Sequence, residues 1–122
     1  MFRNIKKELL KLLKDVSVNI SFEIASEKKL FPHIVLNLVN DVVAQGLHIL
    51  TLDVDIWDRN DSTKNVDDLV DEVIKKLNRV HVITDDIHMV LYLTNILTVR
   101  DSDSTIKRKT CIFEVQVRNK NN

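Results

Sequence analysis

The sequence predicts an α+β fold in which a mostly antiparallel β-sheet is packed by two α-helices. Three observations lead to this prediction. Two segments place apolar residues at helical spacing, five or six segments show strand patterns, and they occur in blocks as a helix, three strands, a helix and two or three strands. A chain of 122 residues with one Gly and one Pro suits a single domain, expected at residues 1–118 with a flexible tail at 119–122.

Both predicted helices are amphipathic. Residues 3–15 and 66–78 repeat apolar side chains every three or four positions, so each helix is expected to dock on the sheet. Asn65 is a plausible N-cap of the second helix, and Asp67 and Asp68 lie in its first turn, where the helix dipole favours acidic groups. The two apolar stripes consist of Ile5, Leu9, Leu12, Leu13 and Val16, and of Leu69, Val70, Val73, Ile74 and Leu77.

Strands are predicted where apolar and polar side chains alternate or β-branched residues gather. Pro32 opens the second strand, where a missing amide donor is tolerable, and Asn40, Asp41 and Gly46 flank its connection to the third. Loops are expected at 25–30, 58–65 and 100–105. The strands are expected at 18–24, from Pro32 through Val39, at 47–57, 87–99 and 106–117, with a short strand or an extended linker at 80–83.

The third strand gives the clearest pattern, because its two faces differ in polarity throughout. This difference predicts a sheet with one packed face and one wet face, as antiparallel sheets often have. The apolar face is Leu50, Leu52, Val54 and Ile56, and the other is Thr51, Asp53, Asp55 and Trp57. In the last strand the apolar face is Cys111, Phe113, Val115 and Val117.

Charge is balanced in total but uneven along the chain. Eighteen basic residues offset eighteen acidic ones, which gives no reason to expect affinity for nucleic acid or for an anionic membrane. Residues 53–72 hold eight acids, whereas bases cluster near the N-terminus and at residues 107–109. Opposite patches on one small domain suit head-to-tail contact between identical subunits, and ordinary solvated surface is the alternative. No apolar run resembles a signal peptide or a membrane span.

An enzymatic interpretation finds little support in the residue types. Asp53 and Asp55 share a face and could bind a divalent cation, as in metal-dependent nucleases, but no matching acid–Lys pair stands on a neighbouring strand. A polar sheet face or a subunit interface is therefore preferred. The lone Cys111 excludes an internal disulfide and is interpreted as a core residue in a reducing compartment. No catalytic group, metal site or cofactor is expected.

Histidines and tryptophan receive weaker interpretations. The four histidines lack the spacing of a zinc site and are taken as surface residues, although two of them could converge in space. They are His33, His48, His81 and His88. Trp57 ends the wet face of the third strand, where it is equally compatible with an interface anchor and with packing onto the second helix.

Four segments, in the right order, resemble the tail terminator proteins of siphophages. Residues 31–35 (Phe31-Pro32-His33-Ile34-Val35) resemble the aromatic–Pro–aromatic–Ile–Val start of a strand in that family, with His33 in place of the second aromatic. Residues 52–58 resemble the central strand, which ends in a pair such as Ile56-Trp57 before a polar turn, and 66–77 the following helix. Residues 101–108 resemble an Asp-rich turn into a basic final strand. The resemblance covers residues 31–118.

The resemblance implies a structural role without catalysis. Tail terminators form hexameric rings that bind the last ring of the major tail tube protein, stop its polymerisation and present a surface to the head connector, or stopper, protein. The expected location is the tail–head junction of a virion, after synthesis in the host cytoplasm. Such a ring uses a heterologous interface that closes on itself.

The candidate interface has two parts. The first is an acidic face formed by Asp53, Asp55, Trp57 and Asp58, and the second comprises Arg100, Asp101, Asp103, Lys107 and Arg108 in and after the last turn. Three alternatives remain open on the sequence. They are another phage neck protein, of the head-closure or tail-completion kind, a small metal-dependent nuclease, and a bacterial regulatory or interaction domain.

Overall fold

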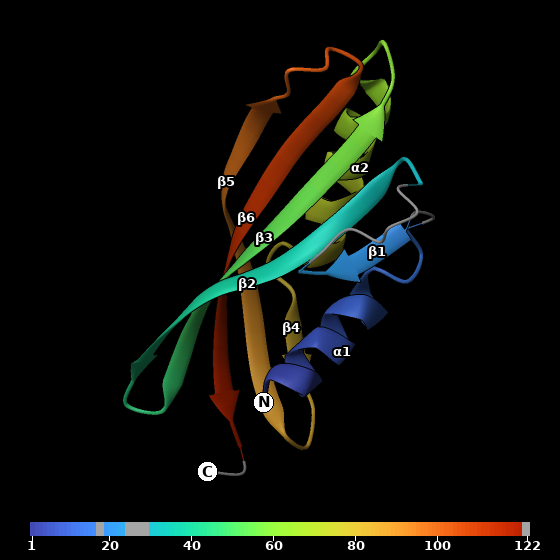
Figure 1. Ribbon diagram of the computed structural model, residues 1–122. Coiled ribbons are helices and arrows are strands. Elements are labelled where there is room, and N and C mark those ends of the chain that lie inside the picture. Colours follow the sequence, from blue (N-terminus) through green and yellow to red (C-terminus); the bar gives the residue numbers. More distant parts are fainter. Residues whose placement is uncertain (17–18, 24–29, 121–122) are drawn as a thin grey trace.

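The computed structural model describes residues 1–16, 19–23 and 30–120, which form two helices and one six-stranded sheet (Figure 1). The strand order is β1-β2-β3-β6-β5-β4. The elements follow the predicted blocks, which confirms the α+β prediction in outline. They are α1 (Phe2–Leu12), β1 (Asn19–Phe22), β2 (His33–Ala44), β3 (Leu47–Arg59), α2 (Lys64–Leu77), β4 (His81–Ile83), β5 (Ile87–Arg100) and β6 (Ile106–Asn119).

The sheet is mixed, so the expectation of a mostly antiparallel sheet holds only roughly. β1 runs parallel to β2, with Asn19 opposite His33, whereas the β2–β3, β3–β6, β5–β6 and β4–β5 pairs are antiparallel. Period-two alternation cannot reveal this difference, because it depends only on burial and not on the direction of the neighbouring strand. The predicted loop at 25–30 lies outside the described residues except for Leu30.

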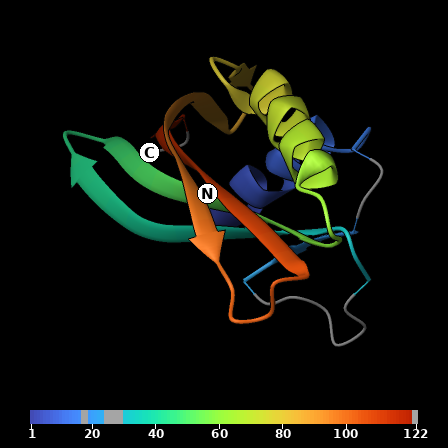
Figure 2. The same cartoon turned by 90° about the horizontal axis from the view of Figure 1, so that it is seen from above.

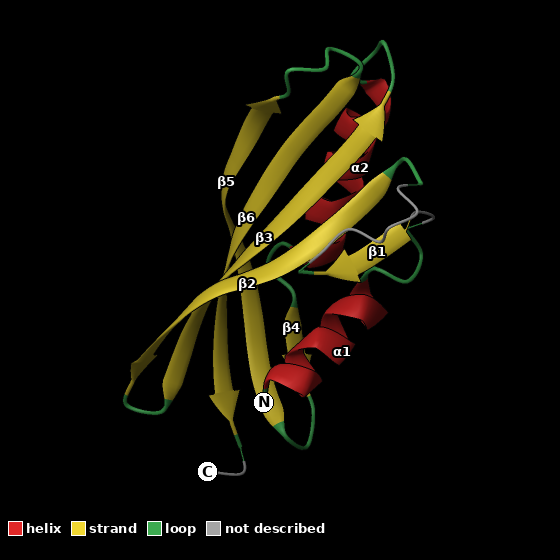
Figure 3. Cartoon of the chain, in the orientation of Figure 1, coloured by secondary structure: helices red, strands yellow, loops and turns green. Residues whose placement is uncertain are grey.

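Both helices cover the same face of the curled sheet, as Figures 2 and 3 show. The apolar faces predicted for the third and last strands are confirmed: Leu52 of β3 and Phe113 of β6, which are register partners, are fully buried. Ile5 and Leu9 of α1 and Val73 and Leu77 of α2 join the same cluster. Neither described helix has the length and apolar character needed to cross a membrane. We call the helix-covered side the inner face and the other side the outer face.

β2 is longer than predicted, because the Asn40 and Asp41 positions belong to the strand and not to a connection. They pair with Thr51 and Leu50 of β3, after a bulge between Leu38 and Asn40. The connection is only Gln45 and Gly46, both with positive φ (52° and 80°). A two-residue hairpin turn needs this backbone geometry, and Gly adopts it without a steric cost.

Both ends of α2 differ slightly from the prediction. The N-cap is Thr63 and not Asn65, since the helix begins at Lys64. The Thr63 hydroxyl donates to Asp67, whose other carboxylate oxygen lies 2.7 Å from Lys109 Nζ of β6. These hydrogen bonds, with that from Lys109 first, hold the pKa of Asp67 below its usual range. The Lys109–Asp67 ion pair therefore ties the first turn of α2 to the sheet.

The last part of the chain is more ordered than expected. β4 is a true strand, paired with β5, and β6 continues to Asn119, which stands opposite Ile87. The Lys120 amide donates to the Asp86 carbonyl at 2.8 Å, so Asn119 and Lys120 are not the loose residues that were predicted. The final residues of the predicted tail, 121–122, lie outside the described part of the chain.

Candidate functional site

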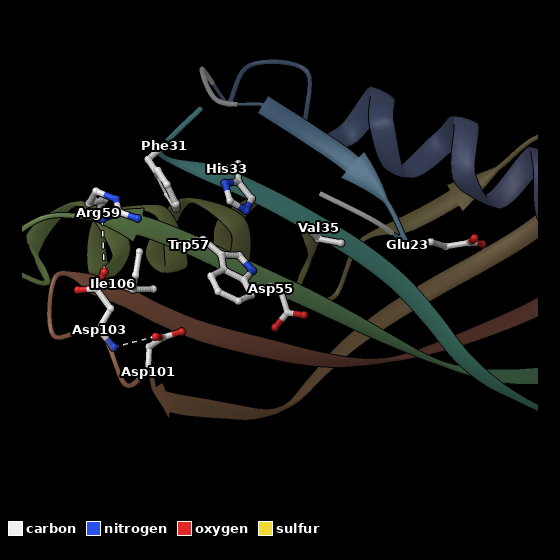
Figure 4. A pocket seen from close by; sticks show the side chains of 10 residues that line it. All are labelled: Glu23, Phe31, His33, Val35, Asp55, Trp57, Arg59, Asp101, Asp103 and Ile106. Carbon is white, nitrogen blue, oxygen red and sulfur yellow. Dashed lines mark hydrogen bonds and ion pairs between the residues drawn. The ribbon is translucent and has the colours of Figure 1, made fainter. Parts of the chain in front are cut away.

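The outer face contains a hollow of about 440 Å³ (Figure 4). It lies where β2 begins and β3 ends, beside the loop between β5 and β6. Because outward positions alternate along each strand, residues of β2 and β3 meet there across the sheet. The lining residues are Glu23, Phe31, His33, Val35, Asp55, Trp57, Arg59, Asp101, Asp103 and Ile106.

Trp57 is the centre of this site and packs on the outer face. His33, Trp57 and Arg108 are register partners on β2, β3 and β6. The His33 ring stacks at 5.8 Å from the Trp57 ring, and the Arg108 guanidinium lies 4.1 Å from its centroid. The predicted alternative of packing onto the second helix is wrong, because α2 covers the opposite face. Trp57 therefore packs on side chains of the neighbouring strands β2 and β6.

Asp55 is held in a polar network next to Trp57. It accepts hydrogen bonds from Arg108 Nη2 at 3.2 Å and from the Thr110 hydroxyl. Asp53 points to the same face, as predicted, but without these partners. Burial, and secondly the Asp55 carboxylate, raise the pKa of Asp53 above its usual range. The two acids therefore differ. The Asp55 carboxylate forms an ion pair with Arg108, whereas the Asp53 carboxylate has no such ion pair among the described residues.

The loop after β5 is an ordered turn that borders the hollow. The Asp103 carboxylate accepts from the Thr105 amide at 2.9 Å and from its hydroxyl at 2.7 Å, while Asp101 accepts from the Asp103 amide at 2.9 Å. Such Asp side chains fix tight turns. The hydrogen bonds from Thr105 are the main cause of the lowered pKa of Asp103. Arg59 Nη1, 3.4 Å from Asp103, fastens the turn to β3.

Three predicted interface residues lie apart from this site. Asp58 is only 3% exposed and does not share the acidic face, because an even-numbered position of β3 points to the inner face. It accepts a hydrogen bond from Asn65 Nδ2 of α2 at 3.1 Å. Lys107 and Arg100 follow Asp58 in register across β6 and β5. Of the three, Lys107 and Arg100 border a second hollow beside α2. The structure therefore gathers Asp53, Asp55, Trp57, Arg108 and the loop acids, but not these three.

Sequence reasoning missed several members of the site, among them His33, Phe31 and Arg59. His33 is only 7% exposed, so its interpretation as a surface residue is wrong. Phe31 lies 5.1 Å from the His33 ring and 5.3 Å from the Arg59 guanidinium. These contacts depend on the register between β2 and β3, and the only hint in the sequence is the aromatic residue before Pro32.

The other chemistry-bearing residues form no further centre in the described part of the chain. Its His, Cys, Asp and Glu side chains include no group of three or more that could hold a metal. His81 and His88 do converge, with ring centroids 6.0 Å apart on exposed strands. Cys111 is buried in the core as predicted, and burial raises the pKa of its thiol to about 11.

Comparison with known proteins yields a likeness among solved structures. No protein-family model matches the chain, and no curated protein matches it either. Among solved structures, a chain of the "Virion of native gene transfer agent (GTA) particle" superposes with a TM-score of 0.70. The match covers 91% of this chain and 90% of that chain at 13% sequence identity. At this identity the likeness shows that the two chains share a fold.

Proposed function

We propose that this chain is a structural protein of a phage-like virion, and specifically a tail terminator. The observation that carries the proposal is the shared fold with a chain of a gene transfer agent virion, which extends over nearly the whole of both chains. The order of the four sequence segments noted above supports the finer assignment. In this role the protein forms a ring, caps the tail tube, stops its growth and joins the tail to the head connector.

The outer-face site suits such an assembly role. Trp57 and Arg108 are residue types that often dominate the binding energy of protein interfaces. They are stacked before any partner arrives, so little side-chain entropy is lost on binding. The Asp53 carboxylate and the turn at residues 101–105 border the same area. We therefore assign this face to contact with a neighbouring subunit or with a partner ring.

The geometry gives no comparable support to the metal-dependent nuclease. A cation at Asp55 would have to displace Arg108 and Thr110, which already bind that carboxylate. Asp58, the next acid along the strand, points to the opposite face and is bonded to Asn65. No particular observation favours a different neck protein over a terminator, so that alternative is left to the experiment.

Electron microscopy of the purified protein, with and without isolated tail tubes, tests the proposal. We expect closed rings that sit on one end of each tube. Rings that bind the head connector and ignore the tube would favour a different neck protein. In a phage that lacks the protein, we expect tails of irregular length that are not joined to capsids. Virions with normal, joined tails would overturn the proposal.

The outer-face assignment has its own test. Asp53→Lys reverses one charge without breaking the Asp55–Arg108 ion pair, whereas a reversal at Asp55 would disrupt the fold. We expect Asp53→Lys to impair ring assembly or tail joining, and Asp61→Lys, in an exposed turn, to act as the matched control. Normal assembly of the Asp53→Lys protein would remove this surface from the interface.

A further inference from the structure

Two strands of the sheet, β2 and β5, each have a long edge with no neighbouring strand among the described residues. β1 pairs only with residues 33–36 of β2, and β4 pairs only with residues 88–90 of β5. Beyond these pairs, the Leu93 amide of β5 finds a side-chain acceptor in Asn78 at 2.9 Å. The rest of each strand pairs on one side only. We call residues 37–44 of β2 the β2 edge and residues 94–100 of β5 the β5 edge. In Figure 1 they lie at opposite ends of the sheet.

Both edges lack two of the usual protections against pairing, although each begins at a bulge and holds one charged residue. Natural edge strands are commonly blunted by Lys, by Pro or by a covering segment. Neither edge contains Lys or Pro. Instead they expose apolar side chains: Val43 of the β2 edge is 60% exposed and Leu97 of the β5 edge is 43% exposed. Val39, Val42 and Ile96 are exposed as well. Unpaired backbone groups beside exposed apolar residues form a surface that another strand can cover.

Charge distinguishes the possible partners of each edge. The β2 edge contains one acid, Asp41, and no base, whereas the β5 edge contains one base, Arg100, and no acid. Pairing of two identical edges puts two like charges in one interface, whereas pairing of the β2 edge with the β5 edge puts one acid and one base in it. Within its own copy, Asp41 also lies 2.8 Å from His48 Nδ1 of β3. β2 and β5 also run in opposite directions within the sheet. If the next copy has the same orientation, its β2 therefore pairs antiparallel with β5 of the first copy.

We propose that the β2 edge of one copy of this chain pairs with the β5 edge of the next copy, so that the sheet continues from subunit to subunit. This contact is heterologous: an open assembly keeps one free β2 edge and one free β5 edge, at its two ends, until it closes. Pairing of only one kind of edge with itself would end at a dimer. The inference rests on the proposed function, which it deepens by naming the contact that closes the ring.

Cross-linking between variants with one added cysteine gives the most direct test. Val43→Cys and Leu97→Cys each add one exposed thiol, while native Cys111 stays unreactive because it is buried and its thiol pKa is raised to about 11. With tail tubes present, a short bismaleimide should join the two variants when they are mixed, and neither variant efficiently to itself. Equal cross-linking of Val43→Cys alone would show identical-edge pairing. No cross-link in the mixture would overturn the proposal.

Charged substitutions separate this inference from the proposed function. Val43→Lys and Leu97→Lys should weaken association at least about tenfold in sedimentation velocity, as the loss of one buried apolar side chain implies. The matched control is Ile83→Lys, since Ile83 is 66% exposed on β4 but outside both edges. Circular dichroism confirms that the variants fold. Capping rings that survive both substitutions would overturn edge pairing alone, whereas edge-paired rings that ignore tail tubes would overturn only the terminator function.

Discussion

At the scale of single residues, Arg108 makes two kinds of contact with one guanidinium group. It stacks on Trp57 at 4.1 Å and pairs with Asp55 at 3.2 Å. Lysine retains the charge but lacks the planar group that stacks. We expect Arg108→Lys to lower the free energy of unfolding by about 1 kcal/mol, the scale of a partly buried cation–π contact. Urea denaturation measures the loss, and Arg118→Lys, exposed on the same strand, should have almost no effect.

Asp53 is expected to make stability depend on pH. Its pKa is raised by burial and by Asp55, so the folded protein holds this proton more tightly than the unfolded chain does. The resulting stability is present below the unfolded pKa of about 3.9 and is lost as the pH rises through the folded pKa. Asp53→Asn should therefore be more stable than the wild type near pH ~7, with a smaller difference near pH ~3. Equal stability of the two proteins across this pH range would show that folding does not raise the pKa of Asp53.

At the scale of elements, Asp58 joins the end of β3 to the start of α2 through Asn65. Asp58 is only 3% exposed, whereas its partner Asn65 is exposed at the start of α2. Asp58→Ala removes this hydrogen bond, and water can replace it at the exposed Asn65 amide, so we expect a loss of about 1 kcal/mol in the free energy of unfolding. Thermal or urea unfolding gives the value. A loss no larger than that of Asp61→Ala, in the exposed turn, would show that the bond does not matter.

The sequence was sufficient for the identity of the elements and for the faces of β3 and β6, because alternation records which side chains are buried. The sequence was insufficient for features that depend on pairing between strands far apart in the chain. The parallel direction of β1, the length of β2 and the burial of His33 all depend on which strand lies alongside. Within the candidate site, Asp55 and Trp57 could be placed on one face from local pattern. Their partners Arg108 and His33 come from other strands, and only the register brings them together.

At the scale of the whole molecule, ring formation should link stability to protein concentration. Association with copies in the folded state shifts the folding equilibrium by mass action. We expect the apparent melting temperature of the wild type to rise with protein concentration, and that of Val43→Lys to rise much less, because its edge cannot pair. Differential scanning calorimetry over a concentration series measures both. A melting temperature that does not change with wild-type concentration would contradict assembly through folded subunits.

The bulges between Leu38 and Asn40 and between Leu93 and Asn95 stand where the two free edges begin. A bulge bends its strand and increases the local twist. If successive copies join along these edges, the two bends set the angle by which each copy turns from the last. The circumference of the closed assembly, and hence the width of the channel it encloses, would then depend on one inserted residue in each of two strands.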